Sequence, residues 1–140
     1  MIRIRIFNVH PKHRVNNRAL VNLSRKVFKG EETTQAECNI VVLDDKRMIA
    51  MNGGYLNHWY VTDVLAFPLH ESTEQGIEGE VYVNVDQARR QAREYGVTLK
   101  NELARLVIHG VLHIIGYRDS TKIQKARMSR LEDKYLTLLK

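Results

Sequence analysis

The sequence predicts an α+β protein in which helices cover a sheet. Strand-like segments come first along the chain and helical segments cluster in its C-terminal half, an order that favours a sheet-and-helix layer. The 44% apolar and 27% charged residues are typical of a globular protein, and 140 residues suffice for one core. We therefore expect one domain over residues 1–140, with a mixed four-stranded sheet packed against helices.

Strands are predicted from alternation and from short apolar runs. Residues 2–8 alternate isoleucine with arginine, which is typical of a strand with one buried face. Pro68 predicts that the strand over residues 62–69 ends there or lies at an edge of the sheet, because proline cannot donate a ladder hydrogen bond. The four predicted strands are residues 2–8, 38–43, 62–69 and 80–85.

Five helices are predicted from apolar spacing, capping residues and glycine stops. The first covers residues 17–29, and Asp44 caps a second that reaches Met51 before Gly53 and Gly54. The other three are residues 86–95 before Gly96, a helix from the Thr98 cap to Ile115 before Gly116, and one from Ser120 to near the C-terminus.

The sequence predicts a cytoplasmic protein that does not enter a membrane. No segment approaches the roughly 20 consecutive apolar residues of a membrane-spanning helix. The alternating pattern of residues 1–9 differs from the continuous apolar stretch of a signal peptide. Cys38 is the single cysteine, so no internal disulfide points to an oxidising compartment.

The net charge of +6 is unevenly distributed along the chain. Residues 1–30 hold eight Lys or Arg and no acid, and residues 89–140 hold twelve bases against five acids. Residues 31–88 hold eleven acids against two bases. Clustered Lys and Arg are the electrostatic footprint of a polyanion partner. A basic protein with a well-solvated surface is the alternative that charge alone leaves open.

The helix predicted before Gly116 contains two histidines within a largely apolar sequence. Apolar residues cover more than half of its circumference, which predicts a mostly buried helix. The remaining polar stripe contains His109 and His113, whose i, i+4 spacing places both rings on one face, one turn apart. Two imidazoles in this arrangement can bind a single metal ion. Glu102 and Arg105 belong to the same stripe.

Asp119 is the third candidate ligand. Gly116 can adopt a positive φ and turn the chain, so that Asp119 returns towards His109 and His113. Three ligands of the His and carboxylate type leave one position of zinc open for water, which distinguishes a catalytic from a structural site. Two alternatives remain: hydrogen-bonded histidines without a metal, and an Asp119 that stabilises the N-terminus of the following helix.

Gly110 argues against peptide hydrolysis. Zinc proteases with two histidines at this spacing place a glutamate directly after the first histidine, where it acts as general base. Gly110 occupies that position here and has no side chain to move a proton. A metal ion that activates water could still catalyse another hydrolysis without a neighbouring base.

Several motifs resemble those of the YbeY endoribonucleases, which are also called rRNA maturation factors. The most specific is HGVLHIIGY at residues 109–117, which is similar to the family signature HGxLHLxGY. Four further segments match in family order: MNGGY at residues 51–55 resembles LNxxY, TDVLAFP at 62–68 resembles TDVLSFP, GEVYVN at 79–84 resembles GDIxIS, and MSRLE at 128–132 resembles MxxxE.

The resemblance implies a zincin-like α+β fold and a metal-dependent endoribonuclease specific for single-stranded RNA. It also implies a role in ribosome quality control and in maturing the 3′ end of 16S rRNA, with the ribosome as partner. The basic termini fit such a partner, because Lys and Arg contacts to phosphates dominate RNA affinity. We expect one Zn²⁺, or another divalent transition metal, on His109, His113 and Asp119.

The sequence departs from the family pattern at two positions. Asp119 stands where the family usually has a third histidine, and a harder oxygen ligand broadens the choice of metal. Leu56 stands where an arginine usually follows LNxxY, so Arg105 or Arg118 would have to take any role facing a phosphate. Asp63 is expected either to support the site or to have a structural capping role.

Other readings of these residues stay open. The chain could be a non-catalytic ribosome-assembly factor that keeps its metal for structure, a rival that the absence of arginine at position 56 strengthens. A metallopeptidase is a weaker rival because of Gly110. Tyr117 and Trp59 could stack on bases, although core packing is the commoner use of such residues.

Overall fold

The fold is a mixed sheet with helices on one face, as the computed structural model describes it for residues 1–56, 61–70 and 76–139. Within these residues four strands form one sheet in the order β1-β2-β4-β3. The three parallel strands lie side by side, and β3 pairs antiparallel with β4 at the edge. The strands are β1 (Ile2–Asn8), β2 (Ala36–Leu43), β3 (Val64–Pro68) and β4 (Ile77–Asn84). The α+β prediction is confirmed.

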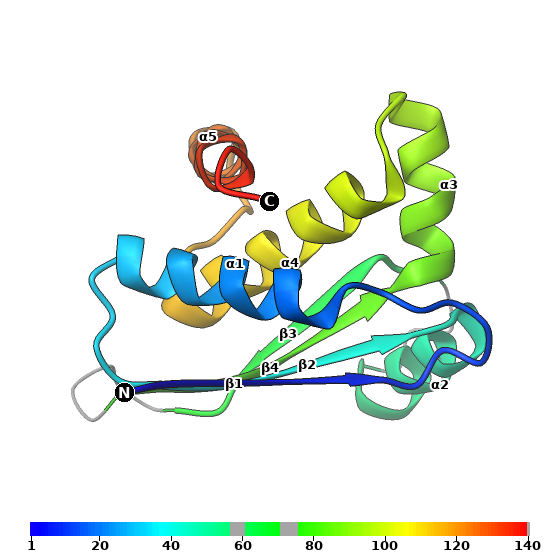
Figure 1. The fold of residues 1–140 in the computed structure, drawn as a ribbon, viewed down its shortest axis with the longest axis horizontal. Helices are drawn as coiled ribbons and strands as arrows, with labels where there is room; N and C mark the ends of the chain where they lie inside the picture. The colour runs from blue at the N-terminus through cyan, green and yellow to red at the C-terminus, as the bar shows by residue number, and fades with distance from the viewer. Residues whose placement is uncertain (57–60, 71–75, 140) are drawn as a thin grey trace.

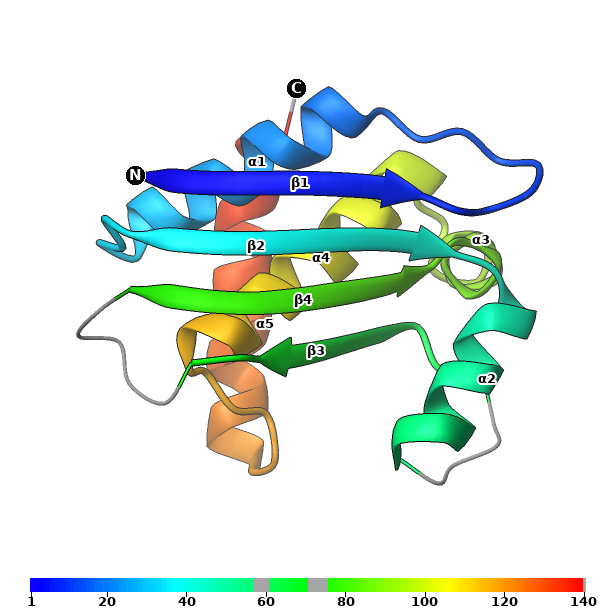
Figure 2. The same ribbon diagram turned by 90° about the horizontal axis from the view of Figure 1, so that it is seen from below.

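The helices form layers on the sheet. Figure 1 shows α1 and α4 above the strands, α5 beyond them and α3 at the end of the sheet. Figure 2 shows the opposite face of the sheet, with the strands in front of α1, α4 and α5. In the described residues no helix is both long and apolar enough to cross a membrane. The helices are α1 (Asn17–Gly30), α2 (Asp45–Leu56), α3 (Val85–Tyr95), α4 (Leu99–Ile115) and α5 (Lys122–Leu136).

Helix α4 lies at the centre and packs closely against β4 because two glycines allow it. A Cβ atom on Gly110 would overlap the side chain of Val81. A Cβ atom on Gly79 of β4 would lie 2.7 Å from Cδ1 of Ile114. Between its two ends, the apolar side chains of α4 are almost fully buried between the sheet and the neighbouring helices, as its periodicity predicts.

Two of the predicted helix boundaries are wrong. Helix α2 continues through Gly53 and Gly54 to Leu56, because each glycine lowers helix stability by only about 1 kcal/mol and does not break the backbone hydrogen bonds. Helix α5 is capped by Thr121 rather than Ser120. The Thr121 hydroxyl accepts from the backbone N–H of Gln124, whose side chain accepts from Thr121 in return, and this reciprocal capping box decides the boundary.

The strand β4 is longer at its start than predicted and ends one residue earlier. Ile77 already pairs with Ala36 of β2, so the ladder begins three residues before Glu80. Val85 belongs to α3, because the side chain of Asn84 accepts hydrogen bonds from the first N–H groups of that helix. Asn84 is therefore the point where the strand turns into the helix.

Candidate metal centre

Helix α4 places His109 and His113 one turn apart on the side that faces a cleft. Their ring centroids are 4.6 Å apart and the rings meet nearly edge to face. The two Nε2 atoms lie only 3.0 Å from each other. Because two nitrogen lone pairs at this distance repel each other, a proton or a cation must lie between them.

Asp119 completes the group. Gly116 has a φ of +125°, and the turn that it allows brings Asp119 back to the helix. The two carboxylate oxygens of Asp119 lie 3.3 Å from Nε2 of His109 and 3.5 Å from Nε2 of His113. One donor atom from each of the three residues lies within 4.8 Å of the others, and all three residues are half-buried. The structure thus brings together the three residues that the sequence singled out.

Glu132 of α5 fixes the orientation of the first histidine. Its buried carboxylate lies 2.7 Å from Nδ1 of His109. A carboxylate accepts only, so Nδ1 carries the proton. Burial lowers the pKa of His109, but the hydrogen bond and negative charge of Glu132 outweigh it, and the pKa is raised overall. In the neutral ring the Nε2 lone pair therefore points towards Asp119, as a metal ligand requires.

The donor set fits a divalent metal ion. Two imidazole nitrogens and a carboxylate oxygen are ligands that zinc and neighbouring transition metals accept. A carboxylate behind the histidine, as Glu132 provides, is the usual support of such a ligand. The residues could therefore hold a metal ion, and their chemistry does not select a single element.

The three residues lie in a cleft of about 580 Å³ between β3, α4 and the segment that follows α4. Asp63, immediately before β3, lines one side, and its negative charge contributes to the raised pKa of His109. Arg118, beside Asp119, is also part of the lining. The cleft therefore offers both a carboxylate and a guanidinium next to the candidate ligands.

The model of the family described as Endoribonuclease YbeY matches residues 5–140. The chain belongs to the YbeY family. The endoribonuclease YbeY of Chloroherpeton thalassium is 40% identical over 113 residues, covering 81% of this chain and 79% of that protein. The endoribonuclease YbeY of Chlorobaculum tepidum is 34% identical and covers 98% of both chains. A solution structure from Thermotoga maritima has a TM-score of 0.67 and 28% identity, covering 99% of this chain and 89% of the other.

Arg105 lies outside the lining of the YbeY cleft. Its guanidinium forms ion pairs with Glu102 and with Glu132, which are both buried. Arg105 therefore connects the two carboxylates behind His109 instead of facing the cleft. Of Arg105 and Arg118, the two arginines considered for phosphate contact, only Arg118 lines the cleft. The side chain of Leu56 and residue Trp59 lie outside the described residues.

Two features of this site were not predicted from the sequence. Glu132 falls in the MSRLE segment that resembles the YbeY motif MxxxE, but nothing local indicates that it supports His109. Tyr117 lines the cleft, and its hydroxyl donates to Glu31, which also accepts from Tyr135. This anchor ties the segment after α4 to the end of α1.

Proposed function

We propose that this chain is a zinc-dependent endoribonuclease that cleaves single-stranded RNA and that residues 1–140 act as one unit. The observation that supports this most strongly is the convergence of His109, His113 and Asp119 in an open cleft. Family membership supports the choice of RNA as substrate. We further propose a cytoplasmic location, ribosomal RNA as the natural substrate and the ribosome as partner, in maturation of the 3′ end of 16S rRNA and in ribosome quality control.

The residues of the cleft divide the chemistry among them. His109, His113 and Asp119 would hold the ion, which supplies Lewis-acid activation of water and of the phosphate. Glu132 keeps the proton of His109 on Nδ1.

Two cleft residues could act on the RNA itself. Arg118 lines the cleft and offers positive charge to a phosphodiester as negative charge develops. Asp63 also lines the cleft and is a carboxylate that can accept a proton from water.

Two other functions are less well supported. A non-catalytic assembly factor would use the same ligands, but the open cleft beside them gives substrate access that a purely structural metal does not need. A metallopeptidase would need a glutamate in place of Gly110, and any side chain there would overlap Val81. The close packing of α4 on β4 thus excludes the usual peptidase base from this position.

The proposal is tested by cleavage of an end-labelled single-stranded RNA, with the same sequence in duplex form and a casein substrate as controls. We expect wild-type protein reloaded with Zn²⁺ to cut only the single strand, and His113→Ala to cut neither RNA. Equal cleavage by wild type and His113→Ala would assign the activity to a contaminating nuclease. Metal uptake without cleavage by wild type would favour the assembly factor.

A further inference from the structure

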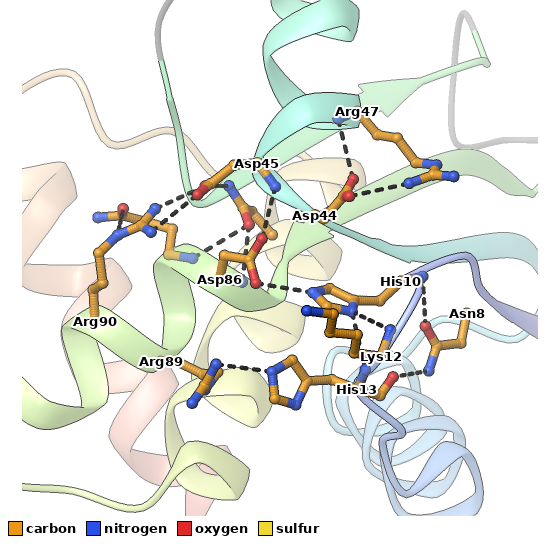
Figure 3. Close-up of polar contacts among 12 residues, drawn as sticks. Asn8, His10, Lys12, His13, Asp44, Asp45, Arg47, Asp86, Arg89 and Arg90 are labelled. Carbon is orange, nitrogen blue, oxygen red and sulfur yellow. Dashed lines mark hydrogen bonds and ion pairs between the residues drawn. The ribbon is translucent and has the colours of Figure 1, made fainter.

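A second polar cluster lies at the carboxyl ends of the three parallel strands. Figure 3 shows side chains from the segments after β1 and β2 facing those at the start of α3. Ligands commonly bind at this edge of open sheets with parallel strands. The cluster contains His10, Lys12, His13, Asp44, Asp45, Asp86, Arg89 and Arg90.

The carboxylates of this cluster are all engaged in internal contacts. Asp86 lies 2.8 Å from Nε2 of His10 and also accepts from the backbone N–H of Asp45. Asp45 forms two hydrogen bonds with the guanidinium of Arg90, which holds the pKa of that carboxyl below its usual value. Asp44 pairs with its neighbour Arg47 at 3.0 Å. The negative charge at this edge is therefore largely compensated.

The histidines of this cluster are arranged unlike metal ligands, although His10, His13 and Asp86 lie close enough to share an ion. The Nδ1 atom of His10 accepts hydrogen bonds from the backbone N–H groups of Lys12 and His13. Nδ1 therefore carries no proton, and in the neutral ring Nε2 donates to Asp86. A histidine that binds metal through Nε2 needs its proton on Nδ1. Hydrogen-bond direction thus argues against a second metal site.

His13 instead holds an arginine. Nη1 of Arg89 lies 2.8 Å from Nε2 of His13. Burial and the nearby Arg89 guanidinium lower the pKa of His13, so the ring stays neutral and can accept this hydrogen bond. A neutral acceptor orients the guanidinium without compensating its charge. Arg89 keeps its positive charge and its other N–H groups for an outside partner.

The loop that carries His13 is rigidly held. The side chain of Asn8 donates to the carbonyl of His13 and accepts from the N–H of His10. Lys12 and Arg14 are exposed on this loop, and like Arg89 they form no ion pair with a carboxylate of the described residues. The guanidinium of Arg89 is thus held beside a loop that carries two exposed cations, and its fixed position lowers the entropy cost of binding an anion.

We propose that Lys12, Arg14 and Arg89 form a phosphate-binding surface that grips the RNA backbone outside the metal cleft. Residues 1–30, which supply two of the three cations, contain no acid, so long-range repulsion of phosphate from that segment is absent. The surface would anchor a structured part of the RNA while a single-stranded part enters the cleft. This deepens the proposed function, because it rests on RNA being the ligand.

The experiment compares two double variants of equal charge. Lys12→Gln/Arg89→Gln removes two cations of the surface. Lys125→Gln/Arg130→Gln is the control, because it removes two exposed cations of α5 that form no ion pair within the described part of the chain. Binding of a fluorescent RNA hairpin without single-stranded ends is measured at several salt concentrations. A short single-stranded RNA, too small to reach beyond the cleft, is used for cleavage.

For the surface variant we expect about tenfold weaker hairpin binding at physiological salt and a salt-dependence slope that falls by about two. The surface variant should cleave the short RNA about as well as wild type. The control variant should bind the hairpin about as tightly as wild type. Equal weakening in both double variants, or no weakening in the surface variant, would overturn the proposal. Lys12→Gln/Arg14→Gln repeats the test without touching the His13 contact. If the wild-type protein binds the hairpin as expected but does not cleave the short RNA, the proposed function is contradicted and the phosphate-binding surface is not.

Discussion

Among the residues that the structure describes, two clusters each combine two histidines with one aspartate, and the hydrogen bonds of their first histidines run in opposite directions. In the group of His109, His113 and Asp119, a carboxylate behind the first ring accepts a hydrogen bond from Nδ1–H, so that Nε2 faces the other two residues. In the group of His10, His13 and Asp86, backbone N–H groups occupy Nδ1 of His10. Nε2 of that ring therefore becomes the donor to the aspartate.

The comparison shows that composition and proximity do not define a metal site. Both groups place three suitable donor atoms within 4.8 Å of one another. Only in the first do the nitrogen lone pairs point at a common place beside an open cleft. In the second, the guanidinium of Arg89 already faces the available nitrogen of His13. Similar residues are therefore arranged as a metal site requires in one region, whereas in the other they hold a loop.

The largest difference between the clusters is expected when each aspartate is replaced. Asp119→Ala removes a ligand and should weaken Zn²⁺ binding more than about a hundredfold, since even supporting partners contribute 10–100-fold. Asp119→His restores the usual family ligand and should bind Zn²⁺ tightly. Asp86→Asn is the matched control and should leave the affinity unchanged. Competition with a fluorescent chelator measures all three, and equal weakening in Asp86→Asn would break the comparison.

The next largest effect is expected from the carboxylate behind the first cluster. Glu132→Gln keeps the size of the side chain but lets it donate as well as accept, so His109 is held less firmly. We expect Zn²⁺ affinity to fall about 10–100-fold. Asp133→Asn, an exposed change of the same kind on the same helix, is the control. Similar affinity of Glu132→Gln and wild type would show that Glu132 has a purely structural role.

Packing of α4 on the sheet positions only the first cluster. Substitutions at two glycines, one inside this packing and one outside it, measure how much the packing contributes to stability. Gly110→Ala inserts a methyl group into Val81 and should destabilise the fold by about 1–3 kcal/mol. Gly54→Ala, in α2 with nothing within 4 Å of the added Cβ, should be neutral or stabilise by up to about 1 kcal/mol. Urea unfolding of both variants measures the difference. A neutral Gly110→Ala would contradict the close packing.

The smallest effect is expected for the second cluster itself. His10→Ala removes the acceptor of two backbone N–H groups and the donor to Asp86. Because the side chain of His10 is only 4% exposed and its ring makes all three of these hydrogen bonds, we expect a loss of about 1–2 kcal/mol in the free energy of unfolding. Zn²⁺ affinity should not change. Lower affinity with unchanged stability would show that His10 is a ligand after all.

Local patterns predicted most of the secondary structure and the candidate ligands. The Thr98 cap, the Gly116 turn and the i, i+4 histidines are all determined within a few residues, so α4 and its two rings follow from the sequence. The start of α5 at Thr121 could also be predicted from the sequence, because Thr121 and Gln124 have the spacing of a capping box. The predicted end of α2 before Gly53 and Gly54 is wrong because glycine weakens a helix without ending it.

Contacts between distant segments could not be predicted. Glu132 lies 23 residues from His109, and only the packing of α5 on α4 brings them together. His10 and Asp86 are 76 residues apart and meet because β1 and β4 end at the same edge of the sheet. The same holds for Arg105, whose stripe position suggested the cleft but whose partners are Glu102 and Glu132. A single sequence specifies such contacts only through the fold.

The most direct test of the difference between the clusters is the number of Zn²⁺ ions bound per chain. Equilibrium dialysis followed by elemental analysis is applied to wild type, His113→Ala and His13→Ala. We predict one tightly bound equivalent in wild type and in His13→Ala, and almost none in His113→Ala. Two equivalents in wild type with one lost in His13→Ala, or a full equivalent retained by His113→Ala, would contradict the assignment of the metal to the α4 cluster.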